Sequence, residues 1–216
     1  MLNTIKSYAK INLFLNVVNK LDTGFHELNS VLSRIDLYDE IRIKDESSFS
    51  ISYNGSFGDQ VGSNDHISKL FNYLIDKNYL KQKSFAIHVV KNIPVGSGLG
   101  GGSSNVAEII KYLIRSNLLD NSSSTEIARD LGSDIEFFID EGSALISGKG
   151  NVDQRLKINS DKHFLIVFPN VQNSTKDIFN KHSNLSGEKF SYNKDTNLDG
   201  ILKNTSNELE KTALLA

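Results

Sequence analysis

Apolar and polar residues follow two different spacings along this chain, and together they predict both strands and helices. Strands, in which apolar residues alternate with polar ones or form short runs, are predicted at 9–18, 38–43, 49–53, 84–93, 143–147 and 163–168. Helices, in which apolar residues recur three and four positions apart, are predicted at 63–79 and 106–117. Shorter helices are expected at 123–131, after Ser174 and at 198–216, and the polar stretch 180–197 is expected to be a loop.

Polar residues and glycines mark the ends of these predicted helices. The N-cap candidates are Ser63, Asn64 or Asp65 for the first long helix and Ser103, Ser104 or Asn105 for the second. Ser123 and Glu126 have the spacing of a capping box. Gly132 is expected to end that helix in the left-handed conformation, with Asp134 just beyond the exit.

A glycine-rich stretch joins the strand at 84–93 to the helix at 106–117. Its glycines are Gly96, Gly98, Gly100, Gly101 and Gly102. Glycine adopts positive φ without penalty and lets the backbone approach a ligand closely. A strand, a glycine loop and a helix in this order direct free backbone N–H groups at one point. The stretch therefore predicts an anion site, above all for phosphate.

Two other interpretations of the glycines stand beside this one. The spacing Gly96-x-Gly98-x-x-Gly101 also matches the dinucleotide fingerprint of a Rossmann fold, with Asp120 about 20 residues further on. Against it, Pro94 separates the strand from the glycines, and Asp120 lies in a polar loop. A plain turn is the other alternative. A P-loop is excluded because no Lys-Ser or Lys-Thr pair follows the glycines.

Composition narrows the class of protein. The 216 residues are 38% hydrophobic and 23% charged, which is enough apolar material for a packed core. A net charge of -2 gives no basic surface for nucleic acid. The absence of cysteine excludes disulfides and thiolate metal sites and favours a cytosolic setting. Polar residues interrupt the first apolar run, so no signal peptide is expected, and no stretch is long enough to span a membrane.

Three small groups of residues are candidates for catalysis or ligand binding. Lys10 and Asn12 lie on the same face of the first predicted strand, which is either a solvated face or part of a site. Phe25 and His26 follow a turn and are either structural or able to stack on and hydrogen-bond a flat ring. Asp134 precedes an aromatic run and is either a turn residue or a partly desolvated base.

Three separated segments together resemble the GHMP kinases. The first, SYAKINLFLNVVNKLDTGFHELNSV, resembles the family's opening strand and turn. The second, NIPVGSGLGGGSSN, resembles its phosphate loop, and the third, LGSDIEFF, resembles its G-A-D-[VI]-x-F-F segment. They occur in the family's order, from near residue 5 to about residue 180. The spelling G-L-G-G-G-S-S is typical of one branch, whose substrate is a cytidine-diphosphate-linked methylerythritol.

The resemblance implies an α+β fold with two parts. A ribosomal-protein-S5-domain-2-like N-terminal domain, which binds ATP, is expected at 1–155, and a ferredoxin-like α/β lobe is expected at 156–216. The family carries a third glycine-rich motif late in the second lobe. Because nothing after Gly150 resembles that motif, we expect the C-terminal lobe to be partial.

The resemblance also implies an activity. It is the ATP-dependent phosphorylation of the 2-hydroxyl of CDP-methylerythritol, in the non-mevalonate route to isoprenoids. ATP is the cosubstrate, and Mg²⁺ is expected to bridge its phosphates with few protein ligands, of which Ser103 or Ser104 is a candidate that the sequence does not decide. The expected partner is this small molecule, with no nucleic acid and no membrane. The chain is expected in the bacterial cytoplasm as a monomer or homodimer.

Site residues follow from the matching motifs. Lys10 and Asp134 match the family's catalytic pair. Asn12, Phe25 and His26 match the substrate site, where the ring of cytosine is recognised. The phosphate loop is matched by Pro94, Val95, Gly96, Ser97, Gly98, Leu99, Gly100, Gly101, Gly102, Ser103 and Ser104.

Two positions depart from the family pattern. Phe25 stands where the family usually has tyrosine, and Asp65 stands where it often has asparagine. These departures and the missing third motif keep other functions open. The chain can be a non-catalytic nucleotide-binding member or a kinase for another small alcohol. The Rossmann spacing keeps a nicotinamide-dependent oxidoreductase as a more distant alternative.

Overall fold

The computed structural model describes residues 4–22, 24–63, 65–81, 84–158, 162–169, 175–183, 185, 187, 189, 198–203 and 206–215. The chain divides into two compact units. Unit 1 comprises 1–9, 36–95 and 99–139, and unit 2 comprises 10–35, 96–98 and 140–216. The chain crosses between them several times, so neither unit is one continuous stretch. The predicted domain boundary between 155 and 156 stays a prediction.

Six strands form the sheet. They are β1 (Ile5–Lys20), β2 (His26–Asp45), β3 (Ser50–Asn54), β4 (Phe85–Val90), β5 (Ser143–Gly148) and β6 (Asn151–Leu156). The order is β3-β4-β2-β5-β6, and β1 pairs with β2. Strand β2 serves both units, because 40–45 pair with β4 and 28–32 pair with β5. Only β3 and β4 run parallel among these registers.

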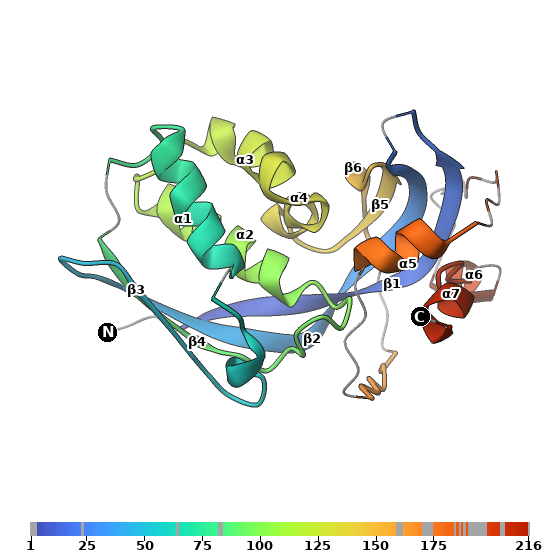
Figure 1. Cartoon of the computed structure of the whole chain (residues 1–216), viewed down its shortest axis with the longest axis horizontal. Coiled ribbons are helices and arrows are strands. Elements are labelled where there is room, and N and C mark those ends of the chain that lie inside the picture. Colours follow the sequence, from blue (N-terminus) through green and yellow to red (C-terminus); the bar gives the residue numbers. More distant parts are fainter. Residues whose placement is uncertain are drawn as a thin grey trace. The chain divides into compact units, whose positions relative to one another are not determined.

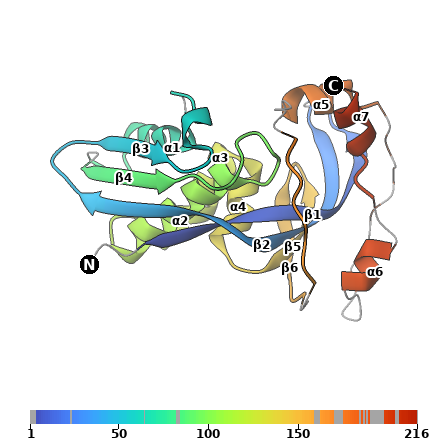
Figure 2. The same ribbon diagram turned by 90° about the horizontal axis from the view of Figure 1, so that it is seen from below.

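In unit 1, four helices cover one face of the sheet part made by β3, β4 and the second half of β2 (Figures 1 and 2). They are α1 (His66–Asp76), α2 (Gly101–Arg115), α3 (Ser124–Leu131) and α4 (Ser133–Ile139), with short 3₁₀ turns η1 (Gly58–Gln60) and η2 (Asn121–Ser123). Helix α2 packs against α1 and α4. Of its predicted apolar stripe, Val106, Ile109, Ile110 and Leu113 are buried, and Ile114 near the end of the helix is partly exposed.

Unit 2 has a smaller core under β1, β2, β5 and β6. Its buried members are Leu13, Phe14, Val31, Leu145, Leu156, Leu198 and Ile201. Three short helices belong to this unit, namely α5 (Thr175–Lys181), α6 (Leu198–Lys203) and α7 (Glu210–Leu214). Helix α6 therefore ties a late part of the chain to the first strands.

The mixed strand and helix content is confirmed, and several predicted elements need correction. Strand β6 was not predicted, and 163–168 were predicted as a strand but form none. In that stretch Leu165 and Val167 are 89% and 79% exposed. Its apolar residues have high β propensity, but a strand also needs a neighbouring strand to pair with.

Several helix ends and caps differ from the prediction. Helix α2 begins at Gly101, earlier than the predicted caps, with Gly100 as its N-cap. Ser123 makes no side-chain capping bond, so the predicted capping box is absent. Gly132 has φ 165°, which is extended backbone, so the predicted left-handed end was wrong. Asp134 lies in the first turn of α4, a helix that was not predicted.

The C-terminal stretch also differs. The predicted single helix at 198–216 is two short helices, α6 and α7. Ser174, the predicted cap of α5, lies outside the described residues. Among the helices of the described residues, none combines the length and apolar character that crossing a membrane requires.

Candidate functional site

The N-terminal end of α2 presents free backbone donors. The N–H of Ser104 donates to the carbonyl of Gly100 at 2.9 Å. The N–H groups of Gly101, Gly102 and Ser103 precede this bond, and no described residue accepts a hydrogen bond from them. Gly100 adopts φ 72°, a conformation that residues with a Cβ rarely adopt. Three donors at the positive end of a 15-residue helix form an arrangement that can bind an anion, and the phosphate site itself stays a prediction.

Close packing explains why the next two positions, Gly101 and Gly102, have no side chain. A Cβ atom at Gly101 would lie 2.8 Å from Nζ of Lys91 and 2.9 Å from Cγ2 of Ile93. A Cβ atom at Gly102 would lie 3.0 Å from Cδ2 of His66. The start of α2 is therefore held between β4 with its following residues on one side and the start of α1 on the other.

A buried ion pair lies next to the N-terminal end of α2. Nζ of Lys91 donates to Oδ2 of Asp39 and to the carbonyl of Ile93, both at 2.7 Å. Oδ1 of Asp39 accepts the N–H groups of Asn92 at 2.7 Å and Ile93 at 2.8 Å. The side chains of Lys91 and Asp39 are 5% and 0% exposed. Desolvation lowers the pKa of Lys91, and the carboxylate of Asp39 opposes that shift.

The two serines after the glycines point in different directions. Ser104 is 1% exposed, and its Oγ accepts a hydrogen bond of 2.8 Å from Oγ of Ser7 on β1. Ser103 is partly exposed. The hydroxyl of Ser104 is thus occupied in the core, whereas Ser103 is the more accessible of the two serines.

Asp134 lies in the first turn of α4, in the same unit as α2. The following residues Ile135, Phe137 and Phe138 are buried, and α4 packs against α2 and α3. Asp134 itself is partly exposed. The N-terminal end of a helix favours a negative charge, so this accessible place suits the carboxylate of Asp134.

In unit 2, Lys10 begins a chain of hydrogen bonds. Its Nζ donates to Oδ1 of Asn12 at 2.9 Å, and Nδ2 of Asn12 donates to Oγ of Ser30 at 2.9 Å. Oγ of Ser30 donates to the carbonyl of Phe14 at 2.5 Å. Lys10 is only 6% exposed, so the solvated-face interpretation is wrong for this residue. Because each polar group is fixed by the next, Lys10 and Asn12 form one oriented unit.

The second group in unit 2 contains Phe25 and His26. Phe25 is 61% exposed, with Nζ of Lys149 at 5.0 Å from its ring centre. The His26 ring stacks on the ring of Phe179 from α5, with centres 5.4 Å apart and planes at 29°. Burial lowers the pKa of His26, and the charges of Lys20 and His182 lower it further. A neutral imidazole both donates and accepts a hydrogen bond, which suits the edge of a heterocycle.

The structure brings together some of the predicted residues. Gly100 to Ser104 and Asp134 lie in unit 1, while Lys10, Asn12, Phe25 and His26 lie in unit 2. Gly96 to Gly98 are grouped with unit 2. Pro94 and Leu99 are buried, and the residues between them are partly or fully exposed. The pairing of Lys10 with Asp134 stays a prediction, as do the other predicted roles.

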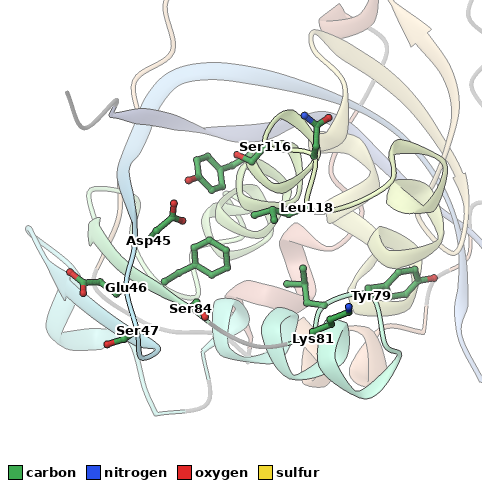
Figure 3. A pocket seen from close by; sticks show the side chains of 12 residues that line it. Asp45, Glu46, Ser47, Tyr79, Lys81, Ser84, Ser116 and Leu118 are labelled. Carbon is green, nitrogen blue, oxygen red and sulfur yellow. The ribbon is translucent and has the colours of Figure 1, made fainter.

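A hollow of about 900 Å³ lies at the opposite end of α2 (Figure 3). It is lined by Asp45, Glu46, Tyr79, Phe85, Tyr112 and Leu118 among others. Figure 3 shows Asp45 and Glu46 on one side and Tyr79 and Lys81 on the other. None of the predicted site residues lines it.

A metal ion has few protein ligands available. Within the described residues, no group of three or more His, Asp or Glu side chains is placed to hold one. Magnesium commonly binds through phosphate oxygens and water with one or two protein carboxylates.

Comparison with known proteins identifies the family. The family model described as "GHMP kinases N terminal domain" matches residues 65–145, which include α1, the glycine loop and α4. The 4-diphosphocytidyl-2-C-methyl-D-erythritol kinase of Pelagibacter ubique is 36% identical over 97% of this chain and 76% of its own length. The chain belongs to the GHMP kinase family. The protein of the same name from Caldicellulosiruptor saccharolyticus is 32% identical to this GHMP kinase, over 95% of the chain and 74% of its own length.

Solved structures agree on the fold of this GHMP kinase. A crystal structure of 4-(cytidine 5'-diphospho)-2C-methyl-D-erythritol kinase matches 99% of the chain and 78% of its own, with a TM-score of 0.72 and 23% identity. The Methanococcus jannaschii mevalonate kinase matches 73% of the chain and 56% of its own, with a TM-score of 0.52 and 17% identity. The predicted fold class is confirmed, and the Rossmann alternative is excluded.

Several residues of these clusters were not singled out from the sequence. They include Asp39, His66, Lys91 and Phe179. Asp39 and Lys91 are 52 positions apart, and Phe179 is far along the chain from His26. Local patterns carry no signal for such pairs. Only His66 had one, because it directly follows the predicted cap residue Asp65.

Proposed function

We propose that this GHMP kinase transfers the γ-phosphoryl group of ATP to the 2-hydroxyl of 4-diphosphocytidyl-2-C-methyl-D-erythritol. The observation that carries the proposal is the match with a kinase of that name at 36% identity over 97% of the chain. The free N–H groups at the start of α2 support the nucleotide half of the proposal. The aromatic group around His26 supports the cytidine half.

Phosphoryl transfer depends on position and charge more than on covalent help from the protein. The N–H groups of Gly101, Gly102 and Ser103 are proposed to bind the phosphate oxygens of ATP, because they point outward from the positive end of α2. Magnesium, when bound, neutralises charge on those phosphates. The phosphates then lie at a fixed place relative to α4, which packs against α2.

The acceptor hydroxyl needs a base and an orienting group. We assign the base to Asp134, which is partly exposed on the first turn of α4. It takes the proton of the 2-hydroxyl as the new O–P bond forms and ADP leaves. Lys10 is assigned to hold the hydroxyl and keep Asp134 ionised, and Asn12 holds Lys10 in place through a 2.9 Å hydrogen bond.

Recognition of the cytosine ring is assigned to Phe25 and His26. Phe25 is largely exposed, so its ring face is available for stacking. His26 is oriented by Phe179, and its lowered pKa keeps it neutral near pH 7. Phenylalanine in place of the family's tyrosine retains stacking and removes one hydroxyl.

The test is an ADP-release assay on the 216-residue chain with Mg-ATP. ADP release that depends on the CDP-linked methylerythritol supports the proposal. In the same assay, Asp134→Asn should reduce turnover by about 10²–10⁴-fold, the range for loss of a general base. The matched control is Asp45→Asn, because Asp45 is also an acid of unit 1 but lines the distant hollow. Full turnover in Asp134→Asn contradicts the assignment of the base.

A non-catalytic nucleotide-binding role is the second candidate. The free N–H groups at the start of α2 suit phosphate binding whether or not transfer follows. This role predicts that ATP raises the unfolding temperature of a folded protein that releases no ADP with the CDP-linked substrate. If ADP is released with another small alcohol instead, the substrate assignment is wrong and the kinase assignment stands.

A further inference from the structure

His66 lies against the first turn of α2, where the proposed phosphate site begins. A Cβ atom at Gly102 would meet three atoms of the imidazole, Cδ2 at 3.0 Å, Cγ at 3.3 Å and Nε2 at 3.4 Å. The ring is therefore in contact with the backbone of Gly102, whose N–H is one of the three free donors. The outer side of the ring is open to solvent.

The position of His66 is fixed by the residue before it. Asp65 is the N-cap of α1, and its Oδ1 accepts the N–H groups of Ile67 at 2.8 Å and Ser68 at 2.9 Å. Oδ1 also accepts the hydroxyl of Tyr53 at 2.8 Å, which ties the cap to β3. A first helical residue held by a cap of this kind has little freedom to move away from α2.

Charged groups on α1 act on His66 in opposite directions. Desolvation by the packed helices lowers the pKa of His66 below 6.5, Lys69 lowers it further, and Asp65 raises it. From α2 the ring faces glycine and serine, and the first charged side chain of that helix is Glu108. Lys91 lies at the other side of the helix start, at Gly101, and is already bound to Asp39. The imidazole is therefore neutral near pH 7 in the free protein.

We propose that His66 takes up a proton when the phosphate groups of a nucleotide bind at the start of α2, so that the complex contains an imidazolium beside the phosphates. The proposal rests on the nucleotide half of the proposed function. A polyphosphate brings several negative charges to a place where the neighbouring backbone supplies only partial positive charge. Each negative charge of the polyphosphate favours the protonated form of the imidazole. The imidazolium in turn strengthens binding of the phosphates.

The direction of the pH dependence follows from linkage. The complex holds a proton on His66 that the free protein has released, so affinity rises as the pH falls between the two pKa values of this group. Each unit by which the bound pKa exceeds the free one corresponds to about tenfold in affinity. Above the pKa of His66 in the complex, and below its pKa in the free protein, His66 does not contribute to the pH dependence of the affinity.

The experiment uses calorimetric binding of Mg-β,γ-methylene-ATP, which resists transfer of its terminal phosphate. Affinities are measured at about pH 6 and about pH 8 for the wild-type chain, His66→Asn and His88→Asn. The phosphate groups of the analogue also change protonation with pH, but this contribution to the pH dependence of affinity is the same for all three proteins. His88 is the matched control, since its ring is bonded to Ser52 on β3 and does not contact the glycine loop. Proton uptake is measured near pH 7 in buffers of different ionisation enthalpy.

The wild-type gain in affinity on acidification should exceed that of His66→Asn by about five- to tenfold, with His88→Asn following the wild type. Proton uptake on binding should fall in His66→Asn only. Equal pH slopes in wild type and His66→Asn, with nucleotide bound by both, overturn the His66 inference and leave the proposed kinase intact. Absence of nucleotide binding in all proteins at both pH values overturns the nucleotide site and this inference together.

Discussion

The two ends of helix α2 differ in what they offer a ligand. At the N-terminal end the backbone of three residues supplies donors, and side chains from the residues after β4 and from the start of α1 pack tightly around the glycines. At the C-terminal end, side chains such as Tyr112, Tyr79 and Asp45 surround a hollow of about 900 Å³. A hollow is thus described at the C-terminal end of α2, and closely packed backbone donors are described at the N-terminal end. Recognition of a phosphate through backbone donors needs closely held peptide groups rather than a large cavity.

Charge separates the two ends as well. The N-terminal end of a helix carries partial positive charge, and the C-terminal end carries partial negative charge. Asp45 and Glu46 add carboxylates beside the C-terminal end. The charge of the helix therefore favours a polyphosphate at the glycine end, whereas the hollow combines the carboxylates of Asp45 and Glu46 with the ammonium of Lys81. Substitutions at the first end should be costly, and comparable substitutions at the second should be mild.

The largest loss of stability is expected from Asp39→Ala. The substitution leaves the Lys91 ammonium buried without its counter-charge, which should lower the free energy of unfolding by about 3–5 kcal/mol. Without Asp39 the pKa of Lys91 falls further below its unfolded value of 10.5. The unfolded state then binds more protons, so the stability of Asp39→Ala should rise with pH between those two pKa values, more steeply than that of the wild type.

Urea unfolding at about pH 7 and about pH 9.5 measures both effects. The double variant Asp39→Ala/Lys91→Met is the control, because it removes both members of the pair and should recover much of the lost stability. A single variant as stable as the wild type at both pH values would show that the pair does not hold the start of α2.

Gly101→Ala should have the next largest effect. Its Cβ would lie within 3 Å of Nζ of Lys91 and of Cγ2 of Ile93, and both neighbours are buried. Forcing them apart should cost about 1–3 kcal/mol and weaken nucleotide binding. Gly62→Ala is the matched control, because nothing lies within 4 Å of the place its new methyl group would take and its φ is not in the left-handed region. Thermal unfolding with and without ATP compares them, and equal behaviour contradicts the packing argument.

Asp65→Ala should cost about 1–2 kcal/mol, since it removes the N-cap of α1. It also frees the hydroxyl of Tyr53, so the end of β3 loses a contact with α1. Asp65→Asn keeps a cap-type side chain and should lose less. Chemical denaturation of the two variants shows which one loses more free energy of unfolding. A larger loss in Asp65→Asn than in Asp65→Ala would show that the charge matters more than the cap.

Asp45→Asn should have the smallest effect, within about 0.5 kcal/mol of the wild type. Asp45 is exposed at the rim of the hollow, and no hydrogen bond or ion pair of its side chain is present among the described residues. The ADP-release rate should also stay unchanged. A loss of turnover in Asp45→Asn would remove the functional difference between the two ends of α2.

Much of the glycine end could be predicted from the sequence, because its signals are local. The glycines and the apolar stripe of α2 lie within one short stretch, and they predict a strand, a loop and a helix in the right order. The cap was wrong because Gly100 starts the helix with a left-handed backbone, whereas the prediction required a polar side chain. Backbone capping by glycine leaves no polar side chain for the sequence to reveal.

The supports of the site could not be predicted, because they join distant parts of the chain. Nothing near Asp39 in the sequence indicates a partner at Lys91, and nothing near His26 indicates Phe179. The stretch 163–168 was wrong for a related reason. Apolar residues predict a strand, but whether they form one depends on a neighbour elsewhere in the chain.

The hydrogen bond between Ser7 and Ser104 has a consequence for how the protein is made. The two hydroxyls are 97 positions apart, so the first strand leaves the ribosome long before its contact on α2 exists. At about 5–20 residues per second, synthesis of the intervening chain takes roughly 5–20 s. During that interval the growing chain has β1 but not yet α2, so the contact that fixes Ser104 at the start of α2 forms only after the middle of the protein has been translated.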